Sequence, residues 1–243
     1  MAQTVVRPSR TCTYICWVDA PSIGRQAEAM SAPEPCLVLD GSARAGVRVG
    51  VLSGGRWVGQ GISTDGALEG LFSCVEAALA ESKLKLGDIR SFALCVGPGS
   101  VLGIRIAALA VRSWSALEPR PIFVWESLAS IARSALVAGE KGPFLVAVES
   151  RLKRWHALEV SADGSLGAPF EAEAAQLNSS GHCVLAASEA APSVLTSHVA
   201  VPHPWSSLPV FFTQSGFLRE EPRPDALNVA NDFATWSGER HRS

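Results

Sequence analysis

The chain has 243 residues, of which 47% are apolar and 18% charged, and it carries a formal net charge of −2. This length suffices for one large or two modest domains, and the apolar fraction is ample for a buried core. The net charge is near neutral, so it does not indicate the basic face that nucleic-acid binding requires. It is still compatible with a local basic patch. The low charged fraction favours a surface that is partly apolar, as protein interfaces are.

Six cysteines are spread along the chain, and none of them forms a Cys-x-x-Cys pair. This usage is typical of the reducing cytoplasm and not of a disulfide scaffold or a zinc site. The sequence has no run of 18 apolar residues, and the stretch Tyr14–Val18 is too short for a secretion signal. We therefore expect a cytoplasmic protein that does not enter the membrane. We expect residues 1–34, which contain Met30, to be a disordered extension or the result of a start site assigned too early.

The first half of the chain alternates strand and helix patterns. Alternating apolar residues and a Gly-Gly turn predict an antiparallel meander of three strands. An apolar stripe at helical spacing follows, then a short strand, a glycine-rich loop, a second helix and a last strand. The predicted strands are 36–39, 45–52, 56–60, 91–96 and 122–124, and the predicted helices are 66–82 and 103–117.

The second half repeats the opening of the first after a helix predicted at 128–137. Strands predicted at 144–148 and 155–160 match the first two strands, and Glu149 holds the place of Asp40. A duplication at this scale predicts an α/β protein of the actin-like (RNase H-like) fold with two βββαβα halves. We assign residues 35–127 to the N-terminal domain and 128–243 to a degenerate C-terminal domain, with a late strand at 208–212 and a frayed tail.

Two features lie where nucleotide-binding members of this fold hold Mg-phosphate. One is the turn of Asp40 and Ser42 after the first strand, and the other is the loop Gly97–Ser100, followed by Arg105. A glycine-rich loop before a helix presents N–H groups to phosphate, but it also serves to pack a helix tightly on a sheet. We favour the structural alternative for both, because a strand-end Asp is ordinary turn chemistry and bulky residues follow the loop.

Other catalytic patterns are absent from the sequence. It has no Gly-x-Ser-x-Gly elbow, no His-Glu-x-x-His and no His-x-x-x-His. His198 and His203 lie five apart in a proline-rich stretch, a poor start for a metal site. We therefore expect no catalytic residue, metal or cofactor of the chain's own.

The segment Gly97-Pro-Gly-Ser-Val-Leu-Gly-Ile-Arg-Ile106 resembles the signature Gly-Pro-Gly-Ser-Phe-Thr-Gly-Leu-Arg-Ile of the TsaB (YeaZ) family, which carries a Gcp-like domain. The resemblance extends from Leu37 to about Val160, and it includes Leu37–Ser42 and Ala147–Arg151. The chain departs from the signature at Val101 and Leu102, where the family has Phe and Thr. The family's Asp-Thr-Ser turn is also changed, to Asp-Gly-Ser.

The resemblance implies a non-catalytic dimerisation subunit in the synthesis of tRNA N6-threonylcarbamoyladenosine. It implies pairing with a catalytic TsaD-like subunit through the two N-domain helices, docking of a TsaE-like ATPase, a homodimer when alone, and contact with tRNA only through the complex. The alternative is an enzyme, either an actin-fold phosphotransferase or a glycoprotease. The expected remnant of a nucleotide site consists of Asp40, Ser42, Gly97, Gly99, Ser100 and Arg105. The expected partner interface consists of Leu71, Cys74, Val75, Ala78, Ala107, Ala110, Val111 and Trp114.

Overall fold

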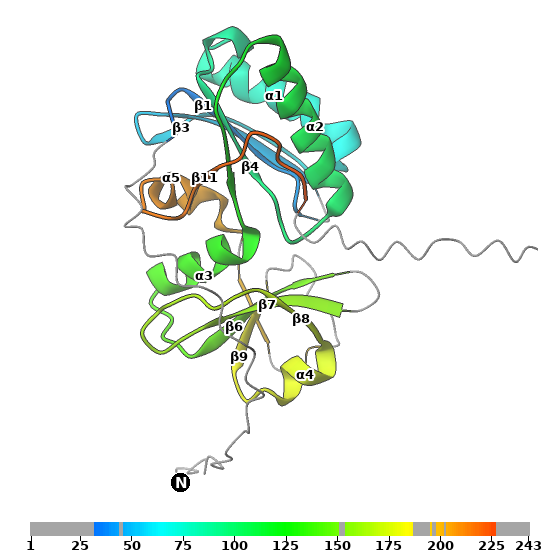
Figure 1. Cartoon of the computed structure of the whole chain (residues 1–243), viewed down its shortest axis with the longest axis vertical. Coiled ribbons are helices and arrows are strands. Elements are labelled where there is room, and N and C mark those ends of the chain that lie inside the picture. Colours follow the sequence, from blue (N-terminus) through cyan, green and yellow to red (C-terminus); the bar gives the residue numbers. More distant parts are fainter. Residues whose placement is uncertain are drawn as a thin grey trace, which may run out of the picture.

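Two mixed β-sheets form the framework of the protein. The computed structural model describes residues 32–43, 46–150, 154–186, 195, 198–201 and 203–226. One sheet lies in the upper half of Figure 1 and the other in the lower half, with α3 and α5 between them. The chain is therefore an α/β protein, as the sequence predicts.

The first sheet has six strands in the order β11-β5-β4-β1-β2-β3. β1 pairs antiparallel with β2 and parallel with β4, and β5 continues the parallel part. The inner strands are buried on both faces, which is why their sequences are nearly continuous apolar runs. The strands are β1 (Cys36–Asp40), β2 (Val47–Ser53), β3 (Arg56–Ser63), β4 (Ser91–Cys95), β5 (Ile122–Trp125) and β11 (Arg219–Glu220).

Helices α1 (Ala67–Ser82) and α2 (Val101–Leu117) cover one face of this sheet (Figure 1). The short η1 (Leu86–Asp88) links α1 to β4. Alternate residues of each strand, such as Leu37 and Leu39, point into the core beneath the two helices. Both helices were predicted from their apolar spacing, and both are confirmed with starts one or two residues away from those expected.

The second sheet repeats the topology of the first. Its order is β10-β9-β6-β7-β8, and each pairing has the same sense as its counterpart in the first sheet. β6 ends at Glu149 as β1 ends at Asp40, so the predicted duplication is confirmed. Helix α3 packs on one face and α4 on the other. The elements are α3 (Ser127–Val137), β6 (Phe144–Glu149), β7 (Arg154–Val160), β8 (Phe170–Glu173), α4 (Ala174–Ser179), β9 (Cys183–Ala186) and β10 (His198–Ala200).

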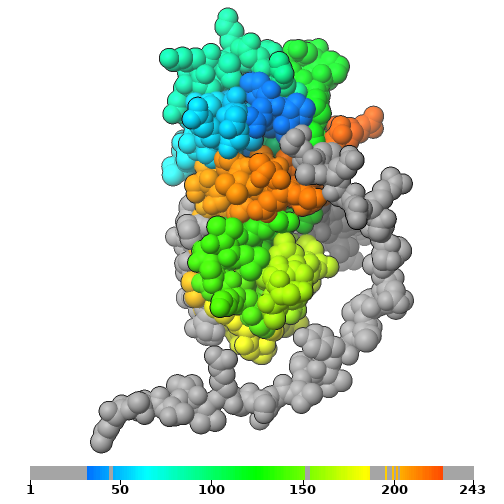
Figure 2. Space-filling view, turned by 90° about the vertical axis from the view of Figure 1, so that its left-hand side faces the viewer, coloured from blue at the N-terminus to red at the C-terminus, as the bar shows by residue number. Residues whose placement is uncertain are grey.

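The C-terminal segment returns from the second sheet to the first. It comprises η2 (Pro204–Ser207), α5 (Leu208–Phe211) and β11, and it covers the face of the first sheet opposite α1 and α2. In Figure 2 this orange segment lies between the blue and cyan upper half and the green and yellow lower half. Residues 203–220 were assigned by sequence to the C-terminal domain, whereas the structure packs them on the N-terminal sheet.

Two further expectations are corrected here. The strand predicted at 208–212 is a helical turn, because Leu208, Phe211 and Phe212 face the sheet at helical spacing while Val210 is exposed. Residues 32–34 were expected in a disordered extension, but Ala32 is buried in the core beneath the C-terminal segment. Residues 1–31 lie outside the described part of the chain. Within that part, no helix has the length and apolarity needed to cross a membrane.

Candidate functional site

The turn after β1 surrounds the carboxylate of Asp40 with groups from the chain itself. Asp40 is 3% exposed. Its Oδ1 accepts hydrogen bonds from the backbone N–H of Ser42 at 2.8 Å and from the Ser42 hydroxyl at 2.6 Å. Its Oδ2 lies 3.2 Å from Nε2 of His203, which directly precedes η2. Both carboxylate oxygens are thus engaged by groups of the chain itself.

These contacts also set the charge state of Asp40. Burial by itself raises the pKa of this carboxyl, but the hydrogen bond and charge of His203 and the two bonds from Ser42 outweigh it, so the pKa lies below its ordinary value. Asp40 is therefore ionised at neutral pH. The sequence singled out Asp40 but missed its partnership with His203, because no local pattern joins residues so far apart in the chain.

The glycine-rich loop and the first turn of α2 pack directly against this turn. A Cβ built on Gly103 would lie 2.1 Å from the carbonyl oxygen of Gly41, and one on Gly99 would lie 2.2 Å from that of Ser42. The backbone N–H of Ser100 donates to the Ser42 carbonyl at 2.7 Å. The glycines thus permit the loop and the start of α2 to approach the backbone of the turn at Asp40 and Ser42 closely.

The other side of the loop is held by α3. The N–H of Ser127 donates to the Gly97 carbonyl at 2.8 Å, and its hydroxyl donates to the Pro98 carbonyl at 2.6 Å. Ser100 caps α2, since its Oγ accepts a bond from the N–H of Gly103. These contacts are those of a structural elbow that aims α2, which is the alternative favoured for the loop on sequence grounds.

Arg105 forms an ion pair with Asp225, with 3.3 Å between Nε and Oδ1. The two side chains are 40% and 53% exposed, so the pair is worth no more than about 1 kcal/mol. Arg105, which was expected at the remnant of the nucleotide site, therefore connects α2 to Asp225, which follows β11 in the chain.

Seven of the eight residues expected at the partner interface are buried in the chain's own core. They are Leu71, Cys74, Val75, Ala78, Ala107, Ala110 and Val111, and only Trp114 is partly exposed. Their side chains hold α1 and α2 on the sheet and cannot reach a partner. The outward faces of the two helices are formed by other residues.

The outward side of α2 carries exposed apolar residues from its first turn to its last, with the polar Arg112 and Ser113 between them. Leu102, Leu109 and Leu117 are 66%, 64% and 87% exposed, and the half-buried Ile106 lies between the first two. These four residues, which we call the α2 stripe, share one face at helical spacing. Phe72 of α1, 52% exposed, contacts the ring of Trp114 edge-on beside this stripe. The signal in the sequence was a helix that is apolar on both faces.

Comparison with known proteins gives a family match within the chain. Residues 65–159 match the family model described as TsaD: tRNA N6-adenosine threonylcarbamoyltransferase. A protein of Mycoplasma genitalium, described as uncharacterized protein MG208, is 42% identical over 45 residues. That match covers 18% of this chain and 23% of the relative.

Two solved structures share the fold. YeaZ from Pseudomonas aeruginosa has a TM-score of 0.57 and 18% identity, over 76% of this chain and 91% of YeaZ. A protein described as similar to the peptidase YeaZ from Pseudomonas aeruginosa has a TM-score of 0.54 and 21% identity, over 75% and 91% of the two chains. At such identities the likeness concerns the fold. The resemblance to the TsaB (YeaZ) family is thus confirmed: the chain has the actin-like fold of YeaZ and, over residues 65–159, the sequence pattern of the TsaD family model.

Proposed function

We propose that this chain is a non-catalytic subunit of the cytoplasmic machinery that makes tRNA N6-threonylcarbamoyladenosine, and that it pairs with a TsaD-like catalytic subunit. The match of residues 65–159 to the threonylcarbamoyltransferase model supports a link to this modification. The YeaZ fold supports the choice of the scaffold subunit over the catalytic one. A TsaE-like ATPase would dock on the pair, and tRNA would be held by the complex.

The observation that carries the non-catalytic role is the closed turn at Asp40. Its carboxylate is bound by His203 and Ser42, and Gly99 of the loop and Gly103 of α2 lie directly against the backbone of the turn. An actin-fold phosphotransferase needs this carboxylate free to face Mg-phosphate. The catalytic chemistry therefore belongs to the partner.

The surface that we assign to the partner is the α2 stripe together with Phe72. Exposed leucines at helical spacing are what helix-to-helix packing between subunits requires, and their burial would contribute about 25 cal/mol per Å² of apolar area. Without the catalytic partner, the same face would join two copies of this chain.

An actin-fold phosphotransferase is the second candidate, and one observation favours it. Asp40 is ionised at the carboxyl end of β1, where kinases of this fold place an acidic residue. This candidate requires His203 to leave Asp40, and it predicts Mg-dependent ATP binding by the isolated chain. The sequence contains neither the nucleophile pattern nor the pair of metal ligands that a glycoprotease would need.

Pairing is tested by co-expression with a TsaD homologue and size-exclusion chromatography. Leu109→Glu should abolish the shared peak, because it puts a charge in the centre of the α2 stripe. Val210→Glu is the matched control, since Val210 is an apolar residue of similar exposure, 59%, on α5. Both variants should keep the melting temperature of the parent chain. Co-elution of the Leu109→Glu chain with TsaD would refute the assigned surface.

A further inference from the structure

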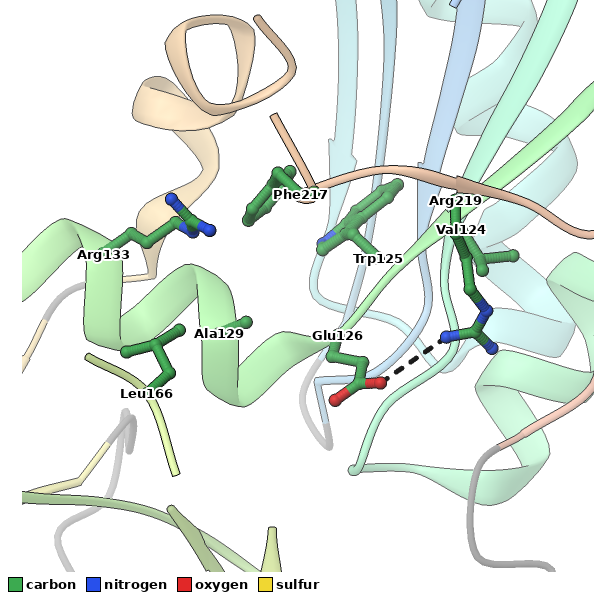
Figure 3. A pocket seen from close by; sticks show the side chains of 9 residues that line it. Val124, Trp125, Glu126, Ala129, Arg133, Leu166, Phe217 and Arg219 are labelled. Carbon is green, nitrogen blue, oxygen red and sulfur yellow. Dashed lines mark ion pairs between the residues drawn. The ribbon is translucent and has the colours of Figure 1, made fainter. Parts of the chain in front are cut away.

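A pocket of about 210 Å³ opens between the two halves of the protein, and neither Asp40 nor Ser42 lines it. Its walls come from the end of β5, the first turns of α3 and the segment that leads into β11 (Figure 3). Val124, Ala129, Leu166 and Phe217 form apolar parts of the wall. Trp125, Glu126, Arg133 and Arg219 supply its polar groups.

Two buried donors in this wall have no acceptor. The indole Nε1 of Trp125 and the Nε of Arg133 are both shielded from water and make no hydrogen bond within the described part of the chain. Trp125 as a whole is 1% exposed. In Figure 3 the nitrogen edge of its ring and the guanidinium of Arg133 face each other across Ala129 and Phe217. An unmet buried donor costs about 1–3 kcal/mol, so two of them in one pocket point to a missing acceptor.

The charge balance indicates what kind of acceptor fits. Among the described residues no carboxylate pairs with Arg133: its Nη1 donates to the neutral Gln214 at 2.6 Å, and its guanidinium lies over the ring of Phe217. Burial lowers the pKa of Arg133, yet a guanidinium keeps its proton in proteins. Glu126 also lines the pocket, but it is paired with Arg219 at 3.5 Å. The positive charge of Arg133 is therefore unbalanced, and a monoanion would neutralise it.

We propose that this pocket binds a small monocarboxylate with a short apolar body. One carboxylate oxygen accepts from Arg133 and the other from the indole N–H of Trp125, while the apolar body lies against Ala129, Leu166 and Phe217. A carboxylate matches guanidinium geometry and accepts from several donors at once. The proposal uses neither the α2 stripe nor the turn at Asp40, so it stands independently of the proposed function.

The probes are isovalerate and its uncharged analogue isovaleramide, added to the ¹⁵N-labelled full chain at neutral pH. The indole N–H resonance of Trp125 is assigned as the one lost in Trp125→Phe. Isovalerate should shift this resonance in a saturable way, and isovaleramide should not. Arg133→Gln should weaken isovalerate binding by about 10–100-fold, since a hydrogen bond to a charged group is removed. The control Arg112→Gln, at an exposed site on α2, should bind as the parent does.

Three outcomes would overturn the proposal. One is no saturable shift with isovalerate, which would mean that the two donors do not meet a carboxylate in this pocket. Another is equal binding of the amide, which would show that the negative charge is not recognised. The third is unchanged affinity in Arg133→Gln, whose melting temperature reports separately whether that variant is folded.

Discussion

Gly103→Ala tests whether the start of α2, which follows the glycine-rich loop, is packed on the turn at Asp40. On its own, alanine at a helical position is favoured over glycine by about 1 kcal/mol. Here the new Cβ would lie 2.1 Å from the Gly41 carbonyl oxygen, far inside van der Waals contact. That oxygen belongs to backbone, and the neighbouring Ser42 carbonyl is held by the N–H of Ser100, so it cannot simply turn away.

Relief of this clash requires the loop and the turn to separate, and overpacking of this kind costs about 1–3 kcal/mol or more. We therefore expect Gly103→Ala to lower the melting temperature by roughly 2–10 °C, as measured by circular dichroism. The matched control is Gly87→Ala in η1, where a Cβ meets nothing within 4 Å, and it should melt within a degree or two of the parent. A Gly103→Ala protein as stable as the parent would refute the closed contact between loop and turn.

Three more predictions concern the buried groups. The pKa of Asp40 is lowered in the folded protein, so its ionised form stabilises the fold fully above about pH 4 and progressively less as the pH falls toward the folded pKa. In urea unfolding, the free energy of unfolding should therefore fall less steeply with acid for Asp40→Asn than for the parent. Parallel pH profiles of the two proteins would contradict this. Trp205→Ala should lower the free energy of unfolding by about 3–5 kcal/mol, because Trp205 stacks on Trp57 with 4.7 Å between ring centroids and is only 5% exposed. A loss of less than about 1 kcal/mol in urea titrations would show that the C-terminal segment is not packed on the first sheet. The thiol of Cys183 is exposed, whereas Cys36 is buried and burial raises its pKa to about 12. Iodoacetamide should therefore label Cys183 in the folded chain and Cys36 only after unfolding, as mass spectrometry would show.

The sequence predicted the parts of the fold that depend on local periodicity. Both N-domain helices and the five strands of the first half follow from apolar spacing and turn residues, and the structure confirms them with small shifts at their ends. The repeat of strand, acidic residue and strand at Asp40 and Glu149 predicted the duplication. These signals are local because the apolar spacing that marks a helix or a strand lies within the element itself.

The C-terminal segment shows what local patterns leave out. Its docking depends on contacts with distant strands, such as Trp205 on Trp57 and His203 on Asp40. The helical turn at Leu208 resembles a strand in sequence because four of its five residues are apolar, and only the sheet beneath it selects the helical spacing. Strands β8, β9 and β10 are short and carry weak patterns, so the sequence did not predict them.

The residues expected at the partner interface proved to be mostly buried, for a related reason. Small and apolar residues of α1 and α2, such as Cys74 and Ala110, fit a helix-to-helix contact with a partner and a core position equally well. The structure assigns them to the core, and it leaves the larger leucines of the α2 stripe exposed. Only the orientation of each helix on the sheet separates these two faces.

Calorimetric titration of the isolated full chain with ATP and Mg²⁺ tests the central claim most directly. The account predicts no saturable binding heat at millimolar ATP, because Asp40 is held by His203 and the glycine-rich loop is closed on the turn. Tight, Mg-dependent binding that is lost in Asp40→Asn would contradict it, and it would assign the chain to the actin-fold phosphotransferases.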